Sequence, residues 1–221
     1  MPRALELFSG TGSVGKVLRE HGWEVVSVDC LQKFKPDICT DIGTWNYTAD
    51  LTVGEFDYMH LSPPCTEYSR ALTTRPRRLE EGDRLALKAL EILTYLQPRY
   101  WTIENPDALL KTRPFMQPLN AYMKRVTYCT YADGDARWSY KKPTCIWTNL
   151  PWTPRTPCCK AHPCEWLHGR GLLHPRSAQK APSSKPQLRD KNEHKREELY
   201  GMPPGLVGEW VRAMGTEGVG G

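Results

Sequence analysis

Short apolar runs alternate with longer amphipathic runs along the first half of the chain, and this order restricts the fold more than any other feature. Apolar runs predict strands over residues 3–8, 24–28, 56–61 and 100–103, with a weaker strand near 37–38. Apolar residues spaced three and four apart predict helices over residues 13–20 and 81–96. Strands and helices in this order predict an α/β fold with a doubly wound, mostly parallel sheet.

Residues 1–149 are expected to form the principal domain. After the predicted sheet strands we expect a helix over residues 116–124. Two further strands follow, over residues 125–131 and 144–148, separated by a connection that contains Gly and Asp. We expect them to form an antiparallel hairpin at one edge of the sheet.

The chain changes character after Asn149. Residues 150–187 are rich in Pro, Arg, Lys, Cys and His and show little periodicity, which indicates a small loop-rich insert. Residues 188–214 are expected to supply C-terminal helices, over 188–200 and 205–214, that pack back on the principal domain. The tail at 215–221 is expected to be disordered.

The composition fits a soluble protein. Of the 221 residues, 39% are hydrophobic and 25% are charged, as in ordinary globular domains. No apolar run approaches the ~20 residues that a membrane helix needs. The N-terminus lacks a signal-peptide pattern, so we expect an intracellular protein, either nuclear or cytoplasmic. A viral or phage protein that acts in a host cell is also consistent with the sequence. The net charge of +5 permits a polyanionic partner.

A glycine-rich turn follows the first predicted strand. Backbone amides in such a strand–turn–helix connection can approach a ligand closely, and the turn consists of Phe8, Ser9, Gly10, Thr11 and Gly12. Acidic residues then end the next strands. Asp29, followed by Cys30, is placed to hydrogen-bond a ribose, and Asp41 with Ile42 could contact an adenine edge.

Cys65 follows a predicted strand and the sequence Ser62-Pro63-Pro64. Two prolines make a stiff, extended lead-in, so we expect the thiol to be presented as a nucleophile. A thiol needs nearby positive charge to ionise at neutral pH, and Lys141, Lys142 or the arginines that follow Cys65 could supply it. Glu104 and Asn105 end another strand, on the edge where open α/β sheets bind ligands.

Several arginines follow the Cys65 loop closely. Arg70, Arg75 and Arg77, together with Ser69 and Lys141, could contact phosphates beside a reactive centre. A solvated loop explains the same arginines equally well.

These motifs resemble those of the cytosine-5 DNA methyltransferases. The resemblance rests on residues 6–12, on Pro64-Cys65 with Ser69, and on Glu104-Asn105, and it extends over residues 3–149. It implies a Rossmann-like methyltransferase fold and a monomer acting on DNA. It also implies S-adenosylmethionine bound against the turn, the strand-end acids and Pro64. A cytosine flipped out of the duplex would be attacked at carbon 6 by Cys65 and steadied by Glu104.

The chain departs from the family pattern in its later part. The family's basic motif commonly reads Gln-x-Arg-x-Arg, whereas this chain has Tyr140-Lys141-Lys142, which makes Lys142 the catalytic candidate there. The insert is far smaller than a typical target-recognition domain. Three alternatives remain open. The first is methylation of RNA. The second is an amino-methyltransferase, although those enzymes have an aromatic residue where this chain has Cys65, and the third is a degenerate subunit that only binds nucleic acid or a partner.

The eight cysteines divide by surroundings. Cys30, Cys39, Cys129 and Cys145 are expected to be small core residues. The insert holds a separate group, for which both a zinc site and a loop of reduced thiols are open interpretations. The candidate zinc ligands are Cys158, Cys159, Cys164 and His168.

Overall fold

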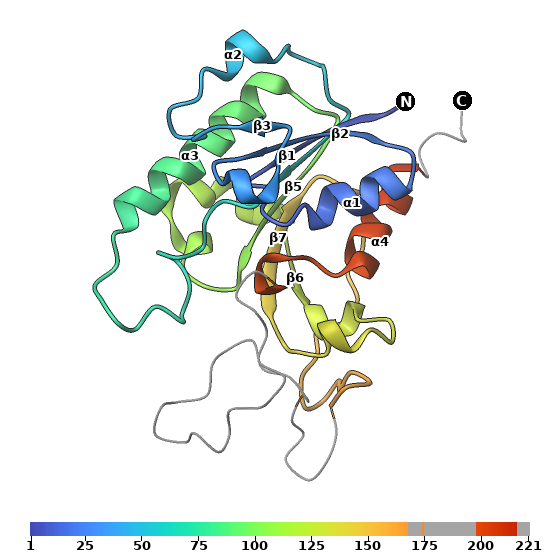
Figure 1. Cartoon of the computed structure of the whole chain (residues 1–221). Helices are drawn as coiled ribbons and strands as arrows, with labels where there is room; N and C mark the ends of the chain where they lie inside the picture. Colours follow the sequence, from blue (N-terminus) through green and yellow to red (C-terminus); the bar gives the residue numbers. More distant parts are fainter. Residues whose placement is uncertain (168–173, 175–197, 216–221) are drawn as a thin grey trace.

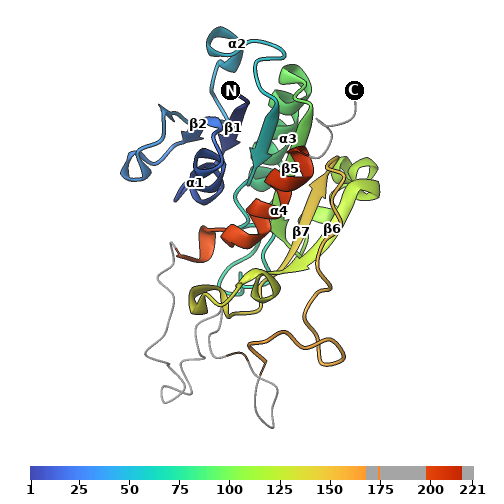
Figure 2. The same ribbon diagram turned by 90° about the vertical axis from the view of Figure 1, so that its right-hand side faces the viewer.

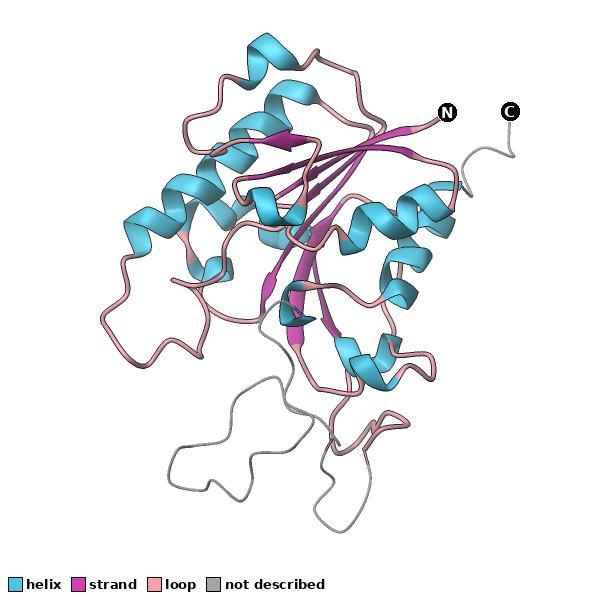
Figure 3. Cartoon of the chain, in the orientation of Figure 1, coloured by secondary structure: helices cyan, strands magenta, loops and turns pink. Residues whose placement is uncertain are grey.

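The computed structural model of the protein describes residues 1–167, 174 and 198–215, coloured along the chain in Figure 1. Its seven strands form one sheet, in magenta in Figure 3. The strands are β1 (Arg3–Leu7), β2 (Glu24–Asp29), β3 (Ile38–Cys39), β4 (Tyr58–Leu61), β5 (Tyr100–Pro106), β6 (Met123–Thr127) and β7 (Pro143–Thr148). The α-helices are α1 (Ser13–Glu20), α2 (Tyr47–Asp50), α3 (Leu79–Leu96) and α4 (Pro204–Gly215).

Short 3-10 helices complete the described elements. They are η1 (Gln32–Phe34), η2 (Leu110–Thr112), η3 (Pro114–Met116), η4 (Pro118–Tyr122), η5 (Tyr128–Tyr131), η6 (Ala136–Trp138) and η8 (Glu198–Tyr200). Within the described part of the chain, no helix combines the length and the apolar character needed to cross a bilayer.

The sheet order is β3-β2-β1-β4-β5-β7-β6. The first five of these strands pair in parallel, whereas β7 runs antiparallel to both β5 and β6. The chain builds outward from β1 in one direction, to β2 and β3, and then returns to build β4 and β5 on the other side. The α/β prediction of a doubly wound sheet with an antiparallel edge is confirmed, and the reversal of direction lies between β1 and β4.

Both faces of the sheet are covered by helices. Successive residues of a strand point to opposite faces. Ala4 and Tyr58 therefore join the core beneath α1 and α4, while Leu5 and Met59 join the core beneath α3. Figure 2 shows α4 in front of the sheet and α3 behind it. This burial on both sides explains why the strands read as nearly continuous apolar runs.

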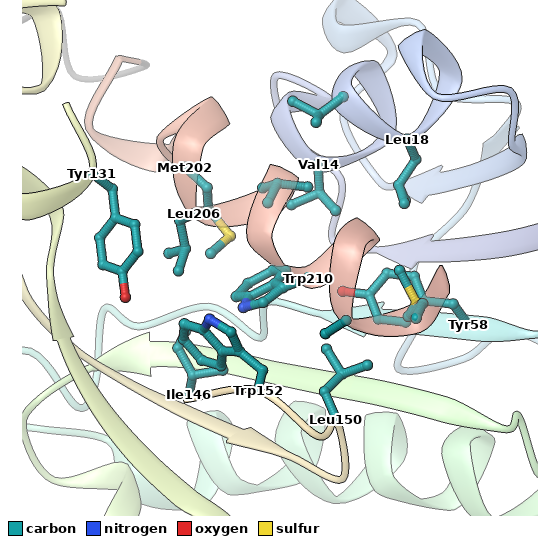
Figure 4. Packing of buried hydrophobic residues seen from close by; sticks show 14 of the residues in the cluster. Val14, Leu18, Tyr58, Tyr131, Ile146, Leu150, Trp152, Met202, Leu206 and Trp210 are labelled. Atoms are coloured by element: carbon teal, nitrogen blue, oxygen red, sulfur yellow. The ribbon is translucent and has the colours of Figure 1, made fainter. Parts of the chain in front are cut away.

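The C-terminal helix α4 packs against α1. Trp210 of α4 is fully buried among Leu18 of α1, Tyr58 of β4 and Trp152, which follows β7 (Figure 4). Ser13, which could have capped α1, instead accepts a hydrogen bond at its Oγ from the Met202 backbone N–H at 3.0 Å. The segment after the insert is therefore tied to the start of α1.

Some predicted elements differ in the structure. The predicted helix over residues 116–124 is wrong: η3 and η4 occupy this stretch, and β6 begins at Met123. Pro118 lacks a backbone N–H and interrupts helical hydrogen bonding there. Most of the helix expected over 188–200 lies outside the described residues, as does the expected tail from residue 216 onward.

Candidate active site

The carboxyl ends of β1, β4 and β5 bring the glycine-rich turn, the Cys65 loop and Glu104 to one edge of the sheet. Leu7 of β1 pairs with Leu61 of β4, and Leu61 pairs in turn with Ile103 of β5. The residues that follow these three positions therefore lie side by side. This is also the edge at the reversal of strand order, where open α/β sheets bind ligands.

The turn after β1 has an unusual backbone. Phe8 has a φ of 57°, and Gly10 and Gly12 have φ values of 48° and 66°. Positive φ is ordinary for glycine but strained for a bulky residue such as Phe8. The Asp29 carboxylate supports the turn, because its Oδ2 accepts a hydrogen bond from the Gly10 N–H at 2.8 Å. Its Oδ1 accepts one from the Leu31 N–H, also at 2.8 Å.

Glu6 is a second carboxylate beneath this turn, and sequence reasoning missed it. Its carboxylate accepts hydrogen bonds from the backbone N–H groups of Val14, at 3.3 Å, and Gly15, at 2.9 Å. Burial raises the pKa of Glu6 to about 7, although these two hydrogen bonds oppose the shift. A Cβ on Gly15 would lie 2.5 Å from the Glu6 Oε2, so a side chain there would displace this carboxylate from its hydrogen bonds. The signal was an acid between Leu5 and Leu7 in a buried strand.

The remaining cofactor candidates lie at the same end of the sheet. Ser9 and Ile42 are buried, whereas Thr11, Cys30 and Asp41 are exposed. The Asp41 Oδ1 accepts a hydrogen bond from the Gly43 N–H at 2.9 Å. Cys30 and Cys39 are both exposed, so the expectation that they are core residues is wrong. The cause is the position of β3, which has two residues and lies at the sheet edge.

Cys65 is half-buried in a loop that is fixed to the neighbouring strand. The Asn105 Nδ2 donates a hydrogen bond to the Pro63 carbonyl at 3.0 Å, and the Cys65 carbonyl accepts one from the Ser69 N–H at 2.8 Å. Burial raises the pKa of the Cys65 thiol. The negative charge of Glu104 raises this pKa further, and the positive charge of Lys142 opposes both.

Glu104 is the centre of a buried polar network. Its Oε2 accepts a hydrogen bond from the Ser62 hydroxyl at 2.8 Å, and its Oε1 accepts one from the Tyr128 hydroxyl at 3.1 Å. The Lys142 Nζ lies 3.7 Å from the same Oε1. This Nζ also donates to the Leu199 carbonyl at 2.9 Å. Sequence reasoning found neither partner hydroxyl, because Tyr128 is 24 residues away and carries no motif.

Asn105, next to Glu104 in the chain, is less completely hydrogen-bonded than Glu104. The side chain is fully buried, and its Oδ1 has no hydrogen-bond partner among the residues that the structure describes. A buried amide oxygen without a partner is unusual in native proteins. The side chain therefore fixes the Cys65 loop through its Nδ2 and keeps one acceptor available.

The arginines after Cys65 build the loop itself. Arg75 forms an ion pair with Glu67, and this bonding, helped by the Arg78 N–H, lowers the pKa of Glu67 to about 2. The Arg77 Nη1 donates to the carbonyls of Glu67, at 2.9 Å, and Ser69, at 2.8 Å. Arg75 and Arg77 thus already have partners within the protein.

Two basic candidates differ from these arginines in their surroundings. Arg70 and Lys141 are exposed. Phosphate contact by any member of the basic group stays a prediction.

The structure regroups the candidate zinc ligands. Cys158 and Cys164 lie together with Cys129, expected to be a plain core residue, and with His174. The Cys159 Sγ lies instead 3.5 Å from the His162 Nδ1. The fourth candidate, His168, lies outside the described residues. Burial, and then the charge of Lys141, lower the pKa of His174.

Comparison with known proteins gives a consistent result. Residues 3–132 match the C-5 cytosine-specific DNA methylase family. The chain is 35% identical over 176 residues to a probable DNA (cytosine-5)-methyltransferase of Frog virus 3 (isolate Goorha), a match that covers 73% of this chain and 77% of that protein.

Two solved structures match the chain at low sequence identity. One is a putative DNA modification methyltransferase encoded within an E. coli prophage, with a TM-score of 0.50 and 14% identity over 71% of this chain. Another is the S. pombe Dnmt2 methyltransferase, with a TM-score of 0.48 and 17% identity over 71% of this chain. The chain covers 52% and 53% of these two proteins, about half of their length.

Proposed function

Because the chain belongs to the C-5 cytosine-specific DNA methylase family, we propose that it methylates carbon 5 of cytosine in DNA through a covalent bond to Cys65. The observation that carries this proposal is the surroundings of Cys65: a half-buried thiol on the loop after β4, with Glu104 and Lys142 acting on its charge. An amino-methyltransferase would need an aromatic residue where this chain has the thiol.

The residues after β1 fit the methyl donor. Gly10 and Gly12 carry no side chain that would block a ligand, and Asp29 holds the turn through the Gly10 N–H. Together with Phe8, Ser9, Thr11, Cys30, Asp41, Ile42 and Pro64 they would hold S-adenosylmethionine. That cofactor would supply the methyl group. Glu6 supports the start of α1 through the backbone N–H groups of Val14 and Gly15.

Cys65 would begin the reaction on a cytosine flipped out of the duplex. Its thiolate attacks carbon 6, and the electrons of the 5,6 double bond make carbon 5 nucleophilic. Carbon 5 would then take the methyl group, with S-adenosylhomocysteine as the second product. A base would remove the carbon 5 proton, and the double bond would re-form as the Cys65 sulfur leaves as a thiolate. Burial and Glu104 keep the resting thiol protonated, while the charge of Lys142 favours the thiolate that attacks.

Glu104 would hold the base during this attack. In its protonated form the carboxyl group can donate a hydrogen bond to cytosine N3 and accept one from the amino group, which favours electron flow into the ring as Cys65 adds. The hydroxyls of Ser62 and Tyr128 fix its two oxygens in place. Asn105 holds the Cys65 loop against β5, the strand that also carries Glu104.

DNA that contains 5-fluorocytosine tests the proposal. Fluorine at carbon 5 cannot leave as a proton does, so the enzyme stays bonded to carbon 6 after methyl transfer. We expect a covalent complex with the wild-type protein that requires S-adenosylmethionine and is absent in Cys65→Ala. The exposed Cys39→Ala is the matched control and should form the complex normally. An adduct that persists in Cys65→Ala would rule the mechanism out.

A parallel arm separates the other activities. The same probe in RNA distinguishes the nucleic acid, and mass spectrometry of the product nucleosides distinguishes carbon from amino methylation. Transfer to RNA alone, or methylation of an amino group, would contradict the proposal. Absence of transfer by folded protein on every substrate would favour a binding subunit.

A further inference from the structure

Four metal-binding side chains meet at a point outside the proposed active site. They are Cys129, Cys158, Cys164 and His174, and their ligand atoms all lie within 4.8 Å of one another. The His174 Nε2 lies 3.6 Å from the Cys158 Sγ and 3.3 Å from the Cys164 Sγ. Cys129 and Cys158 are buried, and Cys164 and His174 are half-buried.

The two nitrogen–sulfur separations, 3.6 and 3.3 Å, lie close to the edge lengths of a tetrahedral zinc site. Zinc–sulfur bonds of about 2.3 Å and zinc–nitrogen bonds of about 2.0–2.1 Å put neighbouring ligand atoms roughly 3.5–3.8 Å apart. Three thiols and one imidazole form a donor set that suits zinc and suits magnesium or calcium poorly. No disulfide joins the cysteines of the described residues, so all three thiols can act as ligands.

We propose that Cys129, Cys158, Cys164 and His174 bind one structural Zn²⁺ that fastens the insert to the edge of the sheet. Four protein ligands close the coordination sphere and leave no position for a reacting water, which makes the role structural. The proposal is independent of the methylation chemistry, because none of the four residues belongs to the proposed active site.

The ligands come from two parts of the chain. Cys129 lies in η5, directly after β6, whereas the other three follow β7. In Figures 1 and 2 the orange segment after β7 runs down beside the sheet, and its later part lies below the sheet, at the same end as η5. The metal would thus cross-link the insert to an element that the sheet already holds in place.

Local hydrogen bonds already bring the ligands together. The Cys158 N–H donates to the Thr127 Oγ1 at 2.8 Å, which places this ligand beside the end of β6. Cys159 and His162 exchange backbone hydrogen bonds of 3.0 and 3.2 Å in a tight turn. That turn reverses the chain between Cys158 and Cys164, so both thiols face the same point.

A second attachment lies just before the ligands. Arg155 donates to the Thr130 carbonyl at 2.7 Å and to the Glu209 carboxylate at 2.7 Å, and it forms an ion pair with Asp133. This network fixes the first residues of the insert to η5 and α4. The metal would extend the attachment to residues that have few apolar side chains of their own to bury.

Elemental analysis of the untagged, full-length protein tests the proposal. Protein from zinc-supplemented cells should carry about one zinc per chain, and Cys129→Ser and Cys164→Ser should each lose it. Cys159→Ser is the matched control and should retain the zinc, because its thiol lies at His162, outside the group. His174→Cys, which restores a fourth ligand, should also retain it.

Cobalt substitution covers the case in which a serine variant does not fold. Cobalt in the wild-type protein should give the thiolate charge-transfer and d–d bands of a tetrahedral site, and His174→Cys should shift them. Folded wild-type protein without zinc would overturn the proposal. This holds whether peptide mass spectrometry finds the thiols free or joined as a disulfide. Full zinc content in folded Cys129→Ser would overturn it as well.

Discussion

Cys65 and Cys129 are both cysteines near one sheet, but their neighbours differ in kind. Cys65 is half-buried, and the charges that act on it belong to Glu104 and Lys142. Cys129 is fully buried, and its neighbours are two further thiols and His174. A lone thiol with one acid and one base can change its charge during a reaction. Thiols gathered around an imidazole instead suit a cation that all of them share.

The largest expected effect is a loss of methyl-transfer activity when Cys65 is replaced. Cys65→Ser should lower the rate of methyl transfer at least roughly a thousandfold, because it removes the nucleophile. Cys39→Ser, at an exposed cysteine outside both groups, should keep the wild-type rate. The measurement is transfer of radiolabelled methyl groups to DNA. A Cys65→Ser protein within tenfold of wild type would contradict the assignment of the nucleophile.

The next effect tests the support of Glu104. Tyr128→Phe and Ser62→Ala each remove one hydrogen bond to this carboxylate. A hydrogen bond to a charged group contributes about 1.5–3 kcal/mol, so each variant should lose roughly ten- to hundredfold in kcat/KM. Tyr122→Phe, at an exposed tyrosine, is the control. Unchanged activity in both variants would show that Glu104 needs neither partner.

The strand pairing that brings each set of residues together explains which of the two sets could be predicted from the sequence. Parallel pairing places the ends of β1, β4 and β5 side by side, so Cys65 and Glu104 could be joined from sequence alone. Tyr128 and Cys129 reach their partners through the antiparallel order β5-β7-β6. A predicted hairpin does not give that order, because either of its strands could pair with β5.

Individual residues show the same limit at shorter range. The sequence makes Arg75 a candidate for phosphate contact, which stays a prediction, and the structure adds its ion pair with Glu67. The sequence likewise places Asp29 to bind a ribose, which also stays a prediction, and the structure adds that its two oxygens accept backbone hydrogen bonds that hold the turn. Motif and spacing predict at which end of the sheet a residue lies. The intramolecular partners that its side chain contacts can be identified only from the structure.

Metal removal should affect one group of thiols and spare the other. With zinc bound, an alkylating reagent should label Cys65 while Cys129, Cys158 and Cys164 stay protected. A chelator should then make these three thiols reactive without changing the labelling of Cys65. Peptide mass spectrometry of the labelled protein measures the extent of alkylation at each of the eight cysteines in one sample. Protection of the three thiols that survives exhaustive chelation would indicate that packing, not metal, shields them.

The smallest expected effect concerns the charge balance at Cys65 itself. The charge of Glu104 raises the pKa of the thiol, so Glu104→Gln should lower it and should speed alkylation at a fixed pH below the midpoint. Lys142→Met removes the opposing positive charge and should move the midpoint to higher pH. Both shifts are modest because burial, the largest cause of the raised pKa, is unchanged. The pH profile of alkylation measures them, with Lys141→Met as the matched control. Shifts of equal sign in Glu104→Gln and Lys142→Met would mean that altered burial, and not the paired charges, controls this thiol.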